Sequence, residues 1–376
     1  QICVQKNRRR RTKFYLKRFS ADAKSINVYI LKSSKKVLSA SLANQCYRDY
    51  FYGKEPDFEH ALGEAENQAA GLLKAIAETN TLPESYSDRI SLQFFVMMQS
   101  SRTAQIVEEL NDMTDSVFKY VFANQAREEG IDINAFQMVL QEPARLALQL
   151  TMENYPMLLD LDMRLVLNAT KEGFVTSDNP VVLCNQFMSF RKHTSSAGYA
   201  SKGLQIFFPL DDRRMLCLFD GDVYRAPGKI GDTLTLKDVR DIYELNAIQA
   251  CSASDVLYFL DKEQNIDALC RKARPYFRAN LTKLKAYPQG TVDGGRRELL
   301  MSSRTPISTD LKLSFLSVRQ TARQWRDTFR RSRMQPAVVV RNAQLLRDHR
   351  EFLEQVRQGA YHHMEFREFL RARNAS

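Results

Sequence analysis

Four polar residues lie on two predicted helices at spacings that could bring opposite charges together. Gln99 lies at the centre of the apolar stripe of a helix predicted to begin near Ser85, and Arg102 lies at the edge of that stripe. On the preceding predicted helix, Glu59 and Glu66 are seven residues apart and share one face beside its apolar seam. An unpaired buried amide costs on the order of 1–3 kcal/mol, and a buried charge costs more. We therefore expect a Glu–Arg pair between the helices, which is either purely structural or part of a polar site where Arg102 binds an anion or stabilises developing charge.

A third polar element is the segment 176–180, Thr-Ser-Asp-Asn-Pro, between two β-prone runs. Asp178 and Asn179 before a proline predict a turn whose side chains cap their own backbone, although the same loop could present a carboxylate at the end of a sheet. A nucleophilic role for Ser177 has no support, because no Gly-x-Ser-x-Gly elbow and no nearby histidine accompany it. The hypothesis is a convergent site with the catalytic candidates Glu66, Arg102 and Asp178 and the supporting residues Glu59, Gln99, Ser177 and Asn179.

Positive charge gathers at the two ends of the sequence. The chain of 376 residues has 55 Lys or Arg and 44 Asp or Glu, for a net charge of +11. Residues 1–20 and residues 311–376 each carry +8, which leaves −5 for the 290 residues between them. Such ends either favour solubility or attract phosphate on nucleic acid or on an anionic membrane face.

The last 66 residues predict a helix with two distinct faces. Its apolar seam runs from Phe315 to Phe329 and includes Trp325. A row of arginines at steps of four, three and four lies about 80° around the helix from that seam. The seam could dock on the globule or on a partner while the row contacts phosphates or the acidic middle of this chain. The candidate nucleic-acid-binding residues are this row and a run near the start of the chain: Arg319, Arg323, Arg326, Arg330, Arg8, Arg9, Arg10 and Arg11.

The sequence does not support several classes of protein. No window approaches the ~18–20 consecutive apolar residues of a membrane span. The six cysteines include no Cys-x-x-Cys pair, and none of the five histidines has metal-ligand spacing, so no metal site is predicted. No glycine-rich nucleotide loop is present, and the sequence identifies no cofactor. Without the apolar core of a signal peptide, we expect a cytoplasmic protein with reduced thiols.

Apolar periodicity predicts an α+β fold that is mainly helical, with a mostly antiparallel sheet and a C-terminal helical appendage. Helices are predicted over 57–78, from 85 through 110, and over 114–130, 140–153, 236–251 and 262–274. Strands are predicted over 163–168, 181–184, 204–210 and 215–218, and a hairpin is predicted from the runs 14–19 and 26–31. The predicted domains are a globular α+β domain over 1–286, a linker rich in Pro and Gly over 287–310, and basic helices over 311–376.

These segments, in this order, resemble the family named domain of unknown function 4238 over about residues 8–275. The most specific parts are Thr176–Pro180 and Gln99-x-x-Arg102-Thr103. The supporting segments are Lys13–Ser20, Asn27–Tyr29, Tyr50–Tyr52, Phe58–Glu66, Phe208–Leu210 and Asn246. The resemblance implies that Glu66, Arg102 and Asp178 are site residues, and it brings no established reaction. Where the family opens with His-His-x-x-Pro, this chain has Arg8, Arg9 and Thr12, which favours a binding or regulatory role over hydrolysis.

Three functions therefore stand as hypotheses. The first is a nucleic-acid-associated cytoplasmic protein, in a setting of bacterial defence or stress, with the C-terminal helices as the contact element. The second is a phosphodiester-cleaving enzyme that uses Glu66, Arg102 and Asp178. The third is a scaffold that meets a partner protein or a second copy through the Trp325 helix. Binding without turnover would separate the first hypothesis from the second.

Overall fold

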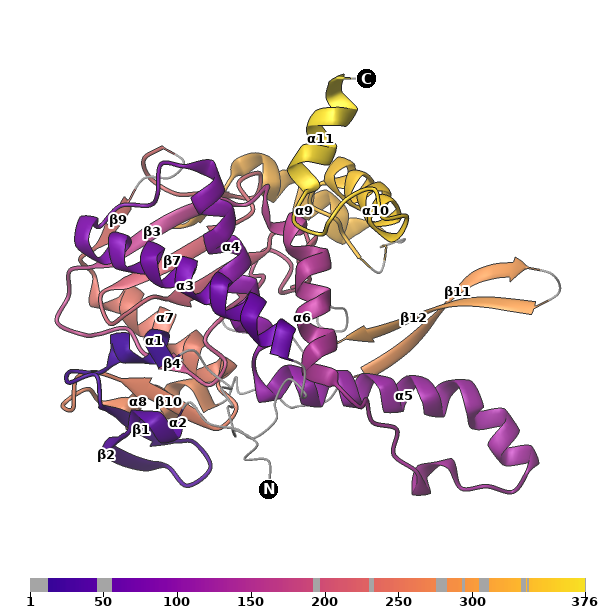
Figure 1. Ribbon diagram of the computed structural model, residues 1–376, viewed down its shortest axis with the longest axis horizontal. Helices are drawn as coiled ribbons and strands as arrows, with labels where there is room; N and C mark the ends of the chain where they lie inside the picture. Colours follow the sequence, from indigo (N-terminus) through magenta and orange to yellow (C-terminus); the bar gives the residue numbers. More distant parts are fainter. Residues whose placement is uncertain are drawn as a thin grey trace.

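A computed structural model describes most of the chain (Figure 1). The described residues are 13–45, 56–191, 197–229, 233–274, 283–292, 295–303, 311–332, 336 and 338–375. Within these ranges, side chains are not described for 56–61, 283–292, 295–299, 301–303 and 375.

The main sheet has five strands in the order β5-β6-β7-β3-β9. Their bounds are Val182–Cys184 for β5, Gln205–Pro209 for β6, Arg214–Phe219 for β7, Asp162–Asn168 for β3 and Thr233–Leu236 for β9. Neighbouring strands are antiparallel except β3 and β9, which are parallel. Both faces of this sheet are covered, and all five residues of β6 are buried. This burial explains why its strands are near-continuous apolar runs in the sequence.

The second sheet is antiparallel and has the strand order β2-β1-β10-β4. It pairs a strand from near residue 25 with a strand from near residue 256. Its strands are β1 (Ser25–Ile30), β2 (Lys35–Ser41), β10 (Val256–Phe259) and β4 (Thr176–Ser177). The first strand therefore pairs with a strand more than 220 residues later in the sequence, from Asn27 with Phe259 to Ile30 with Val256.

The prediction of a strand over Phe14–Phe19 was wrong. This segment forms the short helix α1 (Lys13–Leu16) and the 3₁₀ turn η1 (Lys17–Phe19), and the hairpin is instead formed by β1 and β2. The spacing of its apolar residues explains the difference. Tyr15, Leu16 and Phe19 all face the core, which a helical turn allows, whereas a strand would turn two adjacent residues to opposite faces.

Helices cover the main sheet on both faces (Figure 1). On one face lie α3 (Pro56–Thr79) and α4 (Tyr86–Ser101), and their buried Leu73 and Phe95 pack in one cluster with Phe208 of the sheet. On the other face lie α7 (Val239–Ser252) and α8 (Ile266–Ala273), which pack in a second cluster with the opposite side chains of the same strands. The chain thus has the α+β fold with a mostly antiparallel sheet that the sequence predicted, and its main sheet lies between two helical layers.

One predicted helix is two helices in the structure. The pattern predicted a continuous helix from residue 85 through 110, but α4 ends at Ser101 and α5 runs over Ala104–Glu128. Thr103 lies between them in extended backbone and caps α5, with its side chain accepting a hydrogen bond from the Ile106 amide at 3.2 Å. The next helix, α6, spans Pro143–Asn154. The short elements of the described chain are α2 (Leu42–Gln45), η2 (Ile133–Ala135), η3 (Tyr155–Leu158), β8 (Tyr224–Arg225) and β13 (Ser317–Val318).

The segment predicted as a linker over 287–310 contains much of a β-hairpin. Strands β11 (Lys283–Val292) and β12 (Gly295–Ser303) pair from Lys283 with Ser303 to Val292 with Gly295. The register shifts between Pro288 and Thr291. Two of the residues that suggested a linker, Pro288 and Gly290, lie at this register shift, where such residues disrupt the ladder only locally.

Three helices follow the hairpin, and they pack on the body through apolar side chains. They are α9 (Gln320–Arg331), α10 (Ala343–Arg357) and α11 (Phe366–Ala375). Phe352, Phe366 and Phe369 belong to the same buried cluster as α3 and α4, while Trp325 and Phe329 pack against the cluster on the α7 side. Within the described ranges, no helix is both long and apolar enough to span a membrane.

Candidate functional site

The predicted ion pair between α3 and the end of α4 is present. The Arg102 guanidinium donates from Nη1 to Oε1 of Glu66, and these side chains are only 4% and 14% exposed. Gln99 is also buried, as its place in the apolar stripe predicted. Glu59 lies where side chains are not described. The charge pair is therefore inside the protein, where removing either partner leaves an uncompensated charge.

Arg102 occupies the break between α4 and α5. Its backbone has φ −98° and ψ 33°, outside the helical values of α4, and Thr103 then starts the next helix. Both residues are about 5% exposed or less. The break therefore fixes the position of the Arg102 guanidinium, because α4 and α5 run in different directions on either side of it (Figure 1).

The Asp178 carboxylate holds the turn that follows α7. Its Oδ1 accepts a hydrogen bond from the Ser254 amide and its Oδ2 accepts one from the Asp255 amide, both at 2.8 Å. The turn hypothesis had the side chains of this segment capping their own backbone, whereas the amides that Asp178 caps belong to a distant part of the chain. Asp178 is 7% exposed, so two backbone donors accompany the burial of its charge.

The two neighbours of Asp178 are bound to α7 and α5. Ser177 Oγ accepts hydrogen bonds from Gln249 Nε2 at 2.6 Å and from the Asn179 amide at 3.0 Å. Asn179 Nδ2 donates to Gln105 Oε1 at 2.7 Å and to the Ser252 carbonyl at 3.1 Å. Both residues therefore join segments of the interior.

Gln105 links the two motif blocks that the sequence singled out. Its Oε1 accepts from Asn179 and also from Ser254 Oγ at 3.1 Å, and it lies three residues after Arg102 in the first turn of α5. It is 3% exposed. The sequence analysis missed Gln105, and the apolar pattern held no signal for it, because the break at Thr103 resets the helical phase.

Further motif residues close the same network. The Tyr15 hydroxyl donates to the Pro209 carbonyl at 2.8 Å and lies 2.7 Å from Thr176 Oγ1, from which it accepts. Burial raises the pKa of Tyr15, so the phenol stays protonated. Asn246 accepts from the Val175 amide at 3.0 Å and donates to the Gly173 carbonyl at 2.9 Å. All four polar side chains of 176–179 are therefore engaged in hydrogen bonds.

This buried network can do two things chemically: it holds charge away from water, and it sets the relative positions of α1, α3, α5 and α7. Arg102 could receive an external anion only by sharing its guanidinium with Glu66. In the part of the chain described here, no three His, Cys, Asp or Glu side chains are grouped so that they could hold a metal ion.

A second candidate site is the surface around α9. Trp325 stacks on Phe187 with ring centroids 5.8 Å apart and on Phe329 at 4.8 Å, so the seam docks on the chain's own body. This was one of the two predicted arrangements. The Trp325 face of α9 is therefore packed within a single chain rather than held open for a second copy.

The predicted arginine row is divided by its surroundings. Arg319 precedes α9 and donates from Nε to the Gly221 carbonyl at 2.6 Å and the Tyr224 carbonyl at 3.1 Å. Arg326 is half-buried over the Phe187 ring at 5.5 Å, whereas Arg330 is exposed and lies over Phe190 at 5.1 Å.

Exposed positive charge remains at three positions of α9, which are Arg323, Arg330 and Arg331. The other predicted run, Arg8–Arg11, lies outside the described residues.

Comparison with known families matches residues 12–263 to the family described as "Protein of unknown function (DUF4238)". The chain belongs to this family. Comparisons with curated proteins and with solved structures gave no match. The DUF4238 region runs from α1 beyond β10, so it contains Glu66, Arg102 and the whole 176–180 network. The α9 surface lies after the matched region.

Proposed function

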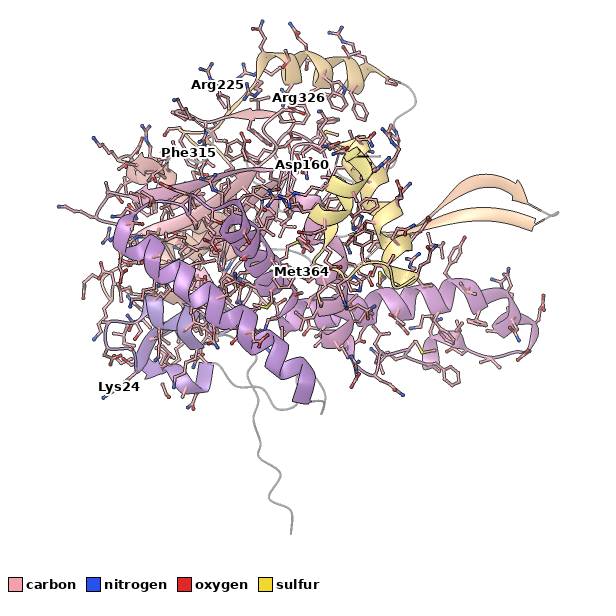
Figure 2. The ribbon with its side chains drawn as sticks, turned by 45° about the horizontal axis from the view of Figure 1, so that its top comes forward. Lys24, Asp160, Arg225, Phe315, Arg326 and Met364 are labelled. Carbon is pink, nitrogen blue, oxygen red and sulfur yellow. The ribbon has the colours of Figure 1, made fainter. Side chains whose placement is uncertain are left out.

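We propose that this protein binds nucleic acid through the phosphate backbone, using the surface of α9. The observation that carries the proposal is the division of α9 into a docked aromatic face and an exposed basic face. Trp325 and Phe329 are packed on the body, while Arg323, Arg330 and Arg331 remain exposed. Figure 2 shows α9 at the upper edge of the body, with nitrogen-tipped side chains extending outward from it.

The charge of this surface supports the same proposal. Within its twelve residues, α9 has four arginines and one acid, Asp327. Two further cations approach its rings from the body, with Lys202 Nζ 5.4 Å from the Trp325 ring and Arg191 5.7 Å from Phe329. Like charges at i, i+4 on a helix repel by a few tenths of a kcal/mol per pair. Phosphate offsets such repulsion, and guanidinium groups bind it with two parallel hydrogen bonds.

The expected binding is independent of base sequence. Arginines on one exposed face meet phosphates, and phosphate contacts position a protein without reading bases. Each neutralised phosphate releases a counterion, so affinity should fall steeply as salt rises.

The test compares two triple variants of the full chain. R323Q/R330Q/R331Q removes the exposed charge of α9, and R347Q/R350Q/R357Q removes three exposed charges from α10 as a matched control. Affinity for a labelled duplex of about 20 base pairs is measured by fluorescence anisotropy between about 50 and 300 mM salt. The α9 variant should lower the slope of log affinity against log salt by about two to three, while the control leaves it close to wild type. Equal slopes for the two variants would refute the proposal.

The nuclease hypothesis has less geometric support. Arg102 is paired with Glu66, and Asp178 accepts two backbone hydrogen bonds, so both groups are occupied before a substrate arrives. The same duplex, incubated with protein and divalent cations and run on a denaturing gel, distinguishes the two functions. Cleavage that an Arg102→Gln variant loses while it remains folded would favour the nuclease. A setting in defence or stress stays a prediction.

A further inference from the structure

Exposed apolar side chains are concentrated in one projecting part of the molecule, which we call the arm. The arm is residues 104–142, comprising α5 and the segment that returns along it through η2. Seven of the fourteen exposed large hydrophobic side chains in the described ranges belong to it: Tyr120, Val121, Phe122, Ile131, Phe136, Met138 and Val139. They are 38–57% exposed. Apolar surface gathered in this way on a soluble protein marks an interaction site.

The arm is an ordered structure. The returning segment is tied to α5 by two side chains, because Asp115 accepts from the Met138 amide at 2.8 Å and Asn111 accepts from the Leu140 amide at 3.0 Å. At the tip, the Ile131 amide donates to the Ala126 carbonyl at 2.8 Å. The exposed side chains are thus displayed from a fixed scaffold. Figure 1 shows that α5 extends away from the body, so the body itself does not cover the tip.

The charge of the arm is opposite to that of the rest of the chain. Residues 104–142 contain eight acids and two basic residues, a net charge of −6, which leaves +17 for the other 337 residues. Of this positive charge, +8 lies in residues 1–20 and +8 in residues 311–376. An acidic arm is repelled by nucleic acid and by anionic membranes. It is attracted to a basic protein surface, where apolar contacts can then form.

We propose that the arm docks on the basic C-terminal region, residues 311–376, of a second copy of this chain. The second copy supplies the complementary charge, and it is present at the same concentration as the arm. Arm-to-arm pairing would instead bring two −6 segments together. The basic region that receives the arm includes α9, so nucleic acid bound at the α9 surface would compete with the arm. Self-association is therefore measured on protein freed of nucleic acid, and its outcome does not depend on whether nucleic acid binds.

Salt dependence tests the charge argument. Full-length protein freed of nucleic acid by a high-salt wash is studied by sedimentation equilibrium between about 5 and 100 μM. We expect reversible self-association at about 100 mM salt that weakens at least tenfold at about 500 mM, because charges across an interface are screened. A protein that is monomeric up to about 100 μM at low salt would overturn the proposal. Association that strengthens with salt would also overturn it, because that is the sign expected for arm-to-arm pairing.

Two kinds of variant test the arm itself. V121Q/F136Q/V139Q removes apolar surface, and L38Q/V239Q/V338Q makes the same change at three exposed positions outside the arm. Only the first should weaken association, by at least tenfold. E108K/D112K reverses two exposed charges and leaves the apolar residues in place, so it should weaken association even if the apolar variant folds poorly. Wild-type association in a folded arm variant would refute the proposal.

Discussion

Arg341 and Asp160 form a two-point ion pair that fixes the start of α10 to the body. Arg341 Nε lies 3.0 Å from Asp160 Oδ2, and its Nη2 lies 2.7 Å from Oδ1. The same guanidinium donates to the carbonyls of Met157 at 2.6 Å and Ser201 at 3.1 Å. The arginine side chain is 4% exposed. A residue beyond the DUF4238 match is thus bound to residues within it, which makes the C-terminal helices part of one folded unit.

Replacing Arg341 should therefore destabilise the whole protein. Arg341→Ala leaves Asp160 and several carbonyls without their donor, and breaking a buried pair costs about 3 kcal/mol or more. Chemical denaturation measures the free energy of unfolding of this variant. The control is Arg347→Ala, which removes an exposed arginine of α10. A loss below about 1 kcal/mol in the free energy of unfolding would show that the Arg341–Asp160 pair contributes little to stability.

The pair of Glu66 and Arg102 should behave as a coupled unit. Arg102→Met should cost about 3 kcal/mol or more, because the Glu66 carboxylate is then buried without its partner. Adding Glu66→Gln should recover part of that loss, so the two effects are not additive. The coupling energy comes from denaturation of both single variants and the double variant. Additive losses would contradict a direct pair.

Removing the Asp178 carboxylate should release the turn after α7. Asp178→Ala removes two hydrogen bonds to a charged acceptor, each worth about 1.5–3 kcal/mol. Amide hydrogen exchange at Ser254 and Asp255 should accelerate, whereas exchange in the main sheet should follow only the global change in stability. Unchanged protection of these two amides would mean that the turn holds without the carboxylate.

Acid should destabilise the protein partly through His349. Burial lowers the pKa of this histidine, whose Nε2 lies 2.6 Å from the Glu153 carbonyl. Below its ordinary pKa of about 6.5, the unfolded chain therefore binds a proton that the folded chain resists, and stability falls as the pH falls. His349→Gln should make this fall shallower by up to about 1.4 kcal/mol per pH unit between pH 7 and pH 5. Urea denaturation at several pH values measures it, with the exposed His362→Gln as control. Identical pH profiles for the two variants would contradict this role.

Long periodic segments were predictable from the sequence, and local interruptions were not. Helix α3, the start of α4 and strands β3, β5, β6 and β7 were placed within a few residues, because burial on defined faces leaves a clear pattern. The end of α4 and strand β9 were not predicted. The helical turn at Phe14 and the hairpin at 283–303 were missed. At Phe14, residue type suggested a strand, whereas the packing of Tyr15 on Phe208 accompanies a helical turn. At 283–303, Pro and Gly suggested a linker, whereas two strands adjacent in the sequence pair with each other.

The candidate site was predictable only in part. The Glu66–Arg102 pair follows from two helical patterns, since polar residues at apolar positions need partners. The contacts of Asp178 and the role of Gln105 depend on how α5 and α7 approach the 176–180 segment. Such tertiary contacts leave no periodic signal in a single sequence. The sequence could therefore indicate Asp178 as a candidate site residue, but it could not predict its hydrogen-bond partners or the role of Gln105.

The pairing of β1 with β10 constrains the order in which the chain can fold during its synthesis. Residues 25–30 leave the ribosome early, yet their partner strand at 256–259 is made more than 220 residues later. The hydrogen-bond partners of Tyr15, Thr176 and Pro209, are likewise synthesised long after Tyr15 itself. Until then the apolar strand Ser25–Ile30 has an open edge that other chains could pair with. The N-terminal hairpin is therefore among the last parts to be completed, and a chain interrupted before residue 256 leaves that edge unprotected.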